Sequence, residues 1–317
     1  MPYGGNDWLA LTQEPTLEPE IPICDPHHHF WDFRTERVPY QRYLLHELAA
    51  DVNCGHNVRS TVFIEARAMY RPDGPVETRP VGEVEFVQGL AAAAATGLYG
   101  PCRAASAIIG HADLKLGDRV EPVLEALQAA SPNRFRGIRH TVTWDPHPEI
   151  ENRETEGVLA TADYRAGAQV LARMGLSLDI GVCFPQLPEL AAFAKDVPNL
   201  TIILNHLGGL TRVGPYANRD DEGLAARYRG GVGVPQRQHQ AGRYRNAPVG
   251  LRLAYSHPAD RFGRVGHVDV SHHELLRRAI RPEPMHVREQ LSGRQGIILP
   301  SRPVQRLQTV LQNLLGL

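Results

Sequence analysis

The chain has 317 residues, of which 42% are hydrophobic, and a formal net charge of −1. This length fits one large α/β barrel or two medium domains. No run approaches the ~18 apolar residues of a membrane span, and the N-terminus lacks a basic flank followed by an apolar core. We therefore expect a cytoplasmic protein without a membrane segment, whose four widely spaced cysteines are reduced.

The charge is divided unevenly along the chain. Residues 1–222 carry 19 Lys and Arg against 30 Asp and Glu, whereas residues 223–317 carry 15 against 5. The balance changes from −11 to +10 at Gly223. A basic tail is typical of segments that bind nucleic acid or anionic surfaces. Its few aromatic residues do not interleave as a stacking platform, so we do not expect nucleic acid as a partner.

Apolar runs of strand length alternate with runs of helix length after a polar, proline-containing arm at residues 1–20. The expected strands lie at residues 21–24, 60–65, 104–109, 135–139, 176–182 and 200–204. The expected helices cover residues 44–52, 81–96, 118–130, 161–174 and 187–197. Strands that follow one another through helical crossovers pair in parallel. The pattern therefore predicts an α/β fold with a parallel sheet.

The first strand leads into residues 25–32, Asp-Pro-His-His-His-Phe-Trp-Asp. Because side chains alternate along a strand, His27 and His29 are expected to face one way and His28 the other. Two imidazoles at i and i+2 at a strand end suit a divalent metal such as zinc or manganese. The alternative is a polar turn whose histidines are solvated or hydrogen-bonded.

Polar side chains recur where the later strands end, at Glu65, His111, Arg139, His140 and His206. In a (β/α)8 barrel the C-terminal ends of all strands face one mouth, so these residues would form one cluster. His206 precedes a Gly-Gly turn that permits close backbone approach, which makes it the best candidate after the two histidines of the first strand.

A structural role is the alternative for Glu65, for His111, and for one of the neighbours Arg139 and His140. Glu65 could pair with Arg67 or Arg139 as a structural bridge. His111 follows a glycine and could cap the next helix. Only one of Arg139 and its neighbour His140 can point into the mouth.

The motif at residues 25–32, together with residues 203–209 and 214–222, resembles the amidohydrolase-related family of metal-dependent hydrolases. The resemblance is to the branch that contains sugar-lactone and pyrone-dicarboxylate lactonases, and it runs from about residue 20 to residue 222. It implies a (β/α)8 TIM barrel with His27 and His29 in the mouth, His206 opposite, and an acid on strand eight acting as the base.

The resemblance also implies hydrolysis of a lactone or a similar small carboxylated substrate. A divalent metal held by His27, His29 and His206 would activate water and polarise the carbonyl. Arg139 would suit a substrate carboxylate through its planar fork, and Glu65 and His111 are further catalytic candidates. Non-oxidative decarboxylation on the same fold is an alternative.

This sequence departs from the family pattern at two places, and both concern the roles that the resemblance implies. Many relatives carry a histidine after strand five, where this chain has Phe184, Pro185 and Gln186. After Gly223 the resemblance ends, and the strand-eight motif with its acid is absent. A metal ligand and the base are therefore both missing from the pattern.

The tail at residues 223–317 has the features of a sequence translated out of frame. Permitted codons for residues 234–246, regrouped one nucleotide later, can spell CPNVNIKLGGIGM, and those for residues 280–295 can spell FGPNRCMFESNFPVDK. Both strings resemble strand-seven and strand-eight segments of the family. A barrel without its last two strands would leave strands one and six as open edges. We therefore expect the chain as given to fold poorly, and an inactive remnant or a basic-tail binding protein is the further alternative.

Overall fold

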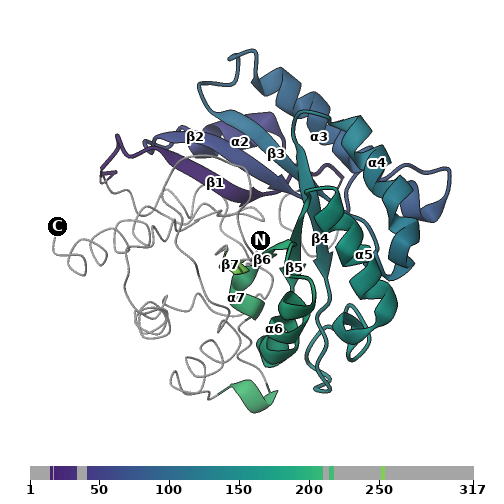
Figure 1. Ribbon diagram of the computed structural model, residues 1–317. Coiled ribbons are helices and arrows are strands. Elements are labelled where there is room, and N and C mark those ends of the chain that lie inside the picture. Colours follow the sequence, from purple (N-terminus) through teal and green to yellow (C-terminus); the bar gives the residue numbers. More distant parts are fainter. Residues whose placement is uncertain (1–14, 17, 34–40, 210–213, 218–250, 254–317) are drawn as a thin grey trace.

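The computed structural model describes residues 15–16, 18–33, 41–209, 214–217 and 251–253 (Figure 1). Most of the expected arm at residues 1–20 lies outside the described residues. The same is true of most of the tail, including the segments whose shifted reading resembles strands seven and eight.

A curled parallel sheet forms the centre of the described part, with its strands in the order β1-β2-β3-β4-β5-β6-β7. Every neighbouring pair is parallel. The strands are β1 (Ile23–His28), β2 (Val58–Ile64), β3 (Arg103–Gly110), β4 (Phe135–Thr141), β5 (Ser177–Gly181), β6 (Thr201–Leu204) and β7 (Leu251–Leu253). The architecture is a partial (β/α)8 barrel, which confirms the predicted fold class.

Helices connect the strands and cover the convex side of the sheet (Figure 1). They are α2 (Leu45–Val52), α3 (Val81–Ala94), α4 (Glu121–Ala130), α5 (Ala162–Arg173), α6 (Leu187–Asp196) and the short α7 (His206–Gly209), with 3-10 turns η1 (Val76–Thr78), η2 (Leu114–Val120), η3 (Val158–Ala160), η4 (Phe184–Gln186) and η5 (Gly214–Tyr216). Each expected helix is present; of the one expected at residues 118–130, the first three residues belong to η2 and the others form α4.

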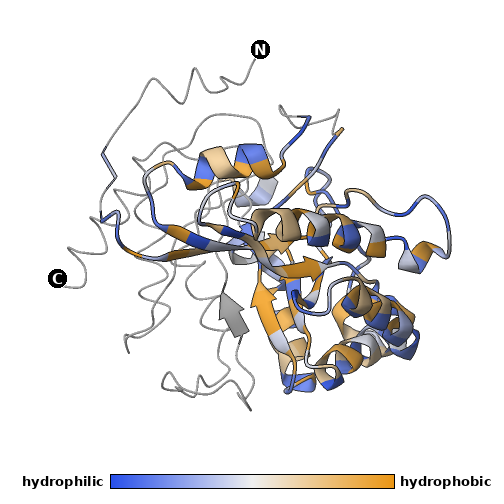
Figure 2. Cartoon of the chain, turned by 90° about the horizontal axis from the view of Figure 1, so that it is seen from above, coloured by the Kyte–Doolittle hydropathy of each residue, from blue (hydrophilic) through white to orange (hydrophobic). Residues whose placement is uncertain are grey.

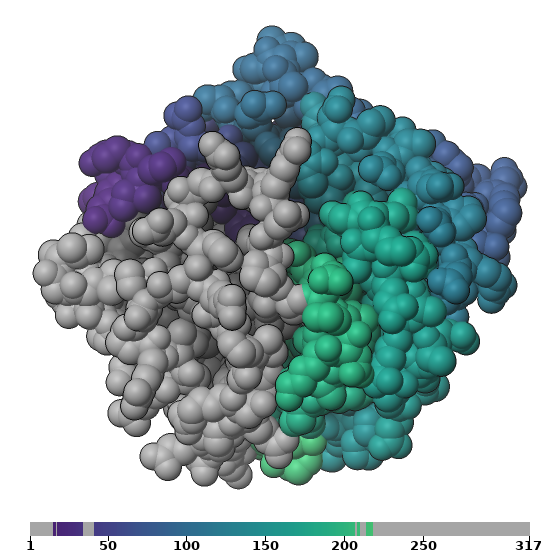
Figure 3. Space-filling view, in the orientation of Figure 1, coloured from purple at the N-terminus to yellow at the C-terminus, as the bar shows by residue number. Residues whose placement is uncertain are grey.

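The hydrophobic core lies between the sheet and these helices. Strand residues such as Ile138 and Leu178 and helix residues such as Leu127 and Leu171 are fully buried in one continuous cluster. In Figure 2 the strands are largely apolar, whereas the helices are polar on part of their surface. The described elements form one arc from β1 to α6 in the space-filling view (Figure 3). This core fixes the strands whose ends carry the polar residues.

The short strand β7 corrects one expectation about the tail. Residues Leu251–Leu253 pair in parallel with β6, so over these three residues β6 is not the open edge that the sequence predicted. Three residues are too few to show a strand pattern in the sequence. At the other end of the sheet, β1 pairs only with β2 among the strands that the structure describes. The barrel is therefore not closed within the described residues.

None of the helices in the described ranges is long and apolar enough to cross a membrane.

Candidate functional site

The three histidines singled out in the sequence lie close together at the ends of β1 and β6. The ring of His27 is 4.9 Å from that of His29 and 5.0 Å from that of His206, measured between ring centroids. His28 faces the opposite side of the strand, where its Nε2 lies 2.8 Å from the hydroxyl of Thr61. The side-chain alternation expected from the sequence is therefore present in this segment.

His29 is held by a backbone carbonyl. Its Nδ1 lies 2.7 Å from the oxygen of Ile64, the last residue of β2. A carbonyl can only accept, so Nδ1 carries the hydrogen and Nε2 keeps its lone pair. This arrangement orients the ring in the way that histidine ligands of metals are commonly oriented.

His27 is neutral in this environment. Burial is the largest cause that lowers its pKa well below the ordinary value, and electrostatic interactions with His29, His206 and Arg139 lower it further. Its Nε2 lies 3.4 Å from a terminal nitrogen of Arg139, which can only donate. The imidazole of His27 therefore offers its lone pair to a guanidinium.

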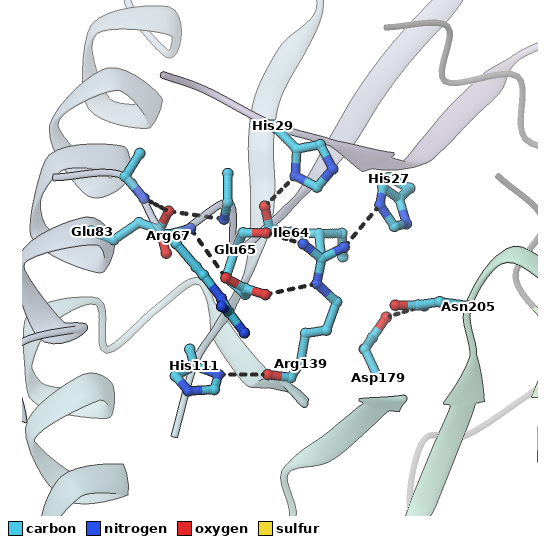
Figure 4. A network of polar contacts seen from close by, with 12 residues as sticks. His27, His29, Ile64, Glu65, Arg67, Glu83, His111, Arg139, Asp179 and Asn205 are labelled. Atoms are coloured by element: carbon cyan, nitrogen blue, oxygen red, sulfur yellow. Dashed lines mark hydrogen bonds and ion pairs between the residues drawn. The ribbon is translucent and has the colours of Figure 1, made fainter. Parts of the chain in front are cut away.

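Arg139, on β4, forms a clamped ion pair with Glu65 (Figure 4). Its Nε donates to Oε1 of Glu65 at 2.9 Å, and a terminal nitrogen donates to the backbone oxygen of the same residue. Only 14% of the Arg139 side chain and 5% of the Glu65 side chain are exposed. Burial works to raise the pKa of Glu65, but Arg139 and then His111 outweigh it, and the pKa lies below its usual value. Glu65 is therefore an ionised partner that fixes Arg139, which is the bridging role that the sequence left open.

Glu83, on α3, holds the loop that carries Glu65. Its Oε1 accepts hydrogen bonds from the backbone N–H groups of Ala66 and Ala68 at 2.9 and 2.8 Å. The side chain is fully buried. Burial, and then the negative charge of Glu65, raises its pKa above the usual value. The sequence analysis missed this residue, whose signal is a carboxylate on the buried face of an otherwise apolar helix.

His111 contacts the backbone of Arg139, with its Nδ1 3.0 Å from the carbonyl oxygen. It does not cap the following helical turn; Asp113 does, by accepting from the N–H of Lys115 at 2.9 Å. Arg139 is the residue of β4 that points into the barrel. Its neighbour His140 packs on the ring of Tyr164 in α5, 5.4 Å away between centroids.

Asp179 and Asn205 form a second buried pair that the sequence analysis missed. Asp179 lies on β5 in direct register with Arg139 on β4, so the two side chains share the inner face of the sheet. Asn205 follows β6 and donates from Nδ2 to Oδ1 of Asp179 at 3.2 Å. Figure 4 shows the pair across Arg139 from Glu65. The available signal was a carboxylate in the middle of an apolar parallel strand.

We expect the substitution Arg139→Met to destabilise the fold by about 3 kcal/mol, because it leaves the buried Glu65 carboxylate unpaired. The double variant Glu65→Gln/Arg139→Met should recover part of this loss, since it removes the uncompensated charge. Both free energies of unfolding are measured by urea denaturation, followed by circular dichroism, in the full-length protein whose tail is read one nucleotide later. A cost for Arg139→Met below about 0.5 kcal/mol, the size of a surface substitution, would contradict this assignment.

The donor set fits a divalent metal only in part. Neutral imidazoles are suitable ligands, and because Nδ1 of His29 donates to Ile64, Nε2 is the atom of this ring that could bind an ion. Within the described ranges, however, no three His, Cys, Asp or Glu side chains are arranged to hold an ion. The guanidinium of Arg139 lies on Nε2 of His27, and Phe184 stands where relatives are expected to carry a histidine.

Comparison with known proteins supports the family assignment. A family model described as amidohydrolase matches residues 24–264. An uncharacterised protein of Sinorhizobium fredii, y4mH, is 29% identical over 206 residues, which cover 60% of this chain and 63% of that protein. The chain thus spans less than two thirds of this relative's length. The family match enters the tail and ends within it.

A solved structure shares the fold. An amidohydrolase from Burkholderia multivorans with bound zinc superposes with a TM-score of 0.54 at 20% identity, over 81% of this chain and 78% of that chain. A probable 2-pyrone-4,6-dicarboxylic acid hydrolase from Acinetobacter baumannii, with citric acid bound, has a TM-score of 0.44 at 12% identity, over 64% and 65% of the two chains.

Proposed function

The chain belongs to the amidohydrolase family, and from that premise we propose that its strand-end site hydrolyses a lactone or a related small substrate that carries a carboxylate. The observation that carries the proposal is the convergence of neutral His27, Arg139 and Glu65 at the ends of parallel strands. Hydrolysis of an ester needs a polarised carbonyl, a positioned water and a proton acceptor. A guanidinium beside neutral imidazoles supplies the first two.

Arg139 has the central role in this proposal. A guanidinium has five N–H groups, and the contacts with Glu65 and His27 leave some of them for a substrate. Its charge would hold a substrate carboxylate or stabilise the negative charge that develops on the carbonyl oxygen during attack by water. Glu65 and His111 fix the position of Arg139, so we assign them positioning roles rather than contact with the reacting atoms.

His27, His29 and His206 are also our proposed ligands for a divalent ion, zinc or manganese. The family is typically metal-dependent, and the Burkholderia multivorans relative was crystallised with zinc. A bound ion would lower the pKa of its water and polarise the carbonyl. We assign no individual step to it, because the described residues do not complete a ligand set.

We further propose that the tail at residues 223–317 is read out of frame and that residues 21–222 are the family-derived body; the family match continues past this boundary to residue 264. The support is the charge reversal at Gly223 and the two family-like strings in the neighbouring frame. The activity would then belong to the protein with its tail read one nucleotide later, and the chain as given would be a defective form.

The test uses two full-length proteins: the chain as given, and the reframed form, whose tail is read one nucleotide later. Both are assayed against a panel of carboxylated and uncarboxylated γ- and δ-lactones, with acid release followed in a pH-stat. We expect the reframed form to hydrolyse at least one carboxylated lactone faster than its uncarboxylated analogue. Carbon dioxide release from aromatic or muconic acids, without lactone hydrolysis, would replace the proposal with the decarboxylase alternative. Metal content of the same samples tests the proposed ligands.

A further inference from the structure

Lactone hydrolysis needs a group that takes a proton from water. The strand-eight acid of the family is not encoded in the frame given, and the shifted string FGPNRCMFESNFPVDK has an asparagine where relatives usually carry it. Two of the buried carboxylates around Arg139 are already occupied. Glu65 is bound by Arg139 and by the N–H of Arg67. Glu83 holds the backbone of Ala66 and Ala68 through Oε1; its Oε2 also has no hydrogen-bond partner, but the side chain lies on the far side of Glu65 from Arg139 (Figure 4). Asp179 is the remaining carboxylate of this network.

Asp179 has one satisfied oxygen and one without a partner. Oδ1 accepts from Asn205, whereas Oδ2 and the amide oxygen of Asn205 are buried with no hydrogen-bond partner. Buried polar atoms are rarely left unpaired. Two unpaired acceptors on adjoining side chains call for hydrogen-bond donors, such as water molecules or a substrate hydroxyl.

The surroundings of Asp179 also set its proton affinity. Arg139 on β4 is the charged group that faces it, and it lowers the pKa; Asn205, at the end of β6, is uncharged and lowers it by hydrogen bonding. Burial outweighs both and raises the pKa of Asp179 to about 7. A carboxyl with such a pKa can both take and return a proton near neutral pH.

We propose that Asp179 is the proton-transfer residue of this site and that it stands in for the missing strand-eight acid. The inference rests on the proposed lactone hydrolysis. Water attacks the carbonyl carbon, a C–O bond forms, the carbonyl π pair moves to oxygen, and Oδ2 of Asp179 takes the proton of the water. When the tetrahedral species collapses, the ring C–O bond breaks and Asp179 returns the proton to the leaving alkoxide. The net reaction adds one water to the lactone.

The test measures kcat/KM against pH for the lactone that the reframed full-length protein hydrolyses fastest; this protein is the wild type in the comparisons that follow. With Asp179 as the base, the rate of the wild type should rise about tenfold per pH unit up to an inflection near pH 7, because the ionised form is active. Asp179→Asn should lose about 100- to 10,000-fold in kcat/KM and should lose this inflection. Added formate should restore activity to Asp179→Ala, because formate fits the vacated space and replaces the carboxylate.

Asp145→Asn is the matched control. Asp145 is an equally buried carboxylate in the loop after β4, where it accepts from the hydroxyl of Tyr216 at 2.7 Å. Its substitution should keep the inflection and give no response to formate. If Asp179→Asn retains the inflection, or formate leaves Asp179→Ala inactive while wild type hydrolyses the lactone, the inference is wrong and the hydrolase proposal stands. A wild type that hydrolyses no lactone overturns both.

Discussion

Reading the codons from Gly223 onward one nucleotide later should convert an aggregating chain into a soluble protein with one cooperative unfolding transition. The described sheet is held at one end by β7, which has only three residues, and at the other end β1 pairs only with β2. Exposed strand edges are templates for association with other chains, and barrel closure removes them. The shifted reading supplies the two strand-like segments that closure requires. Light scattering and scanning calorimetry of the two full-length forms measure the difference.

A third form, with the same codons read two nucleotides later, is the control for this comparison. It removes the arginine-rich tail without supplying the family-like strings, so it should aggregate as the given chain does. A high-temperature, cooperative transition of the given chain would contradict the account of its tail. Resequencing the coding DNA decides separately whether the displacement lies in the gene.

His27→Ala and His29→Ala are each expected to lower kcat/KM by at least about 100-fold in the soluble form. The two rings meet at a centroid distance of 4.9 Å, and each presents a lone pair: that of His27 faces Arg139, and that of His29 is left by the hydrogen bond to Ile64. Removal of either imidazole takes a proposed metal ligand or a group that positions water from the site. Lactone hydrolysis in a pH-stat measures the loss.

His46→Ala is the control for the histidine variants, because His46 is exposed on α2, where its ring lies beside that of Tyr99 in the segment before β3. The His46→Ala variant should hydrolyse the lactone with the kcat/KM of the wild type. If His27→Ala and His29→Ala retain activity within about threefold of wild type, the first strand does not carry the chemistry and the proposed site is wrong.

The sequence predicted the parallel sheet because short apolar runs and amphipathic runs alternate regularly up to residue 204. Period and length are local properties, so each strand from β1 to β6 was found within a few residues of its bounds. The sequence also predicted, for the same reason, that the side chains of His27 and His29 point to the same side of the strand. It depends only on strand alternation.

The contacts between strands could not be predicted from the sequence. The sequence left open whether Glu65 pairs with Arg67 or Arg139, and register and burial place Arg139 against Glu65 and His27. Asp179 was read only as part of an apolar run. Its pairing with Asn205 depends on which residues lie opposite one another in adjacent strands. β7 has only three residues, which is too few for a pattern in the sequence, and it is recognised by its pairing with β6.

The most direct test of the central claim is the rate of lactone hydrolysis by the given chain and the reframed chain, assayed side by side with their metal content. We expect the reframed chain to turn over a carboxylated lactone and the given chain to be inactive. Equal rates would show that the tail is read correctly, and a reframed chain that folds but hydrolyses no lactone would contradict the proposed function.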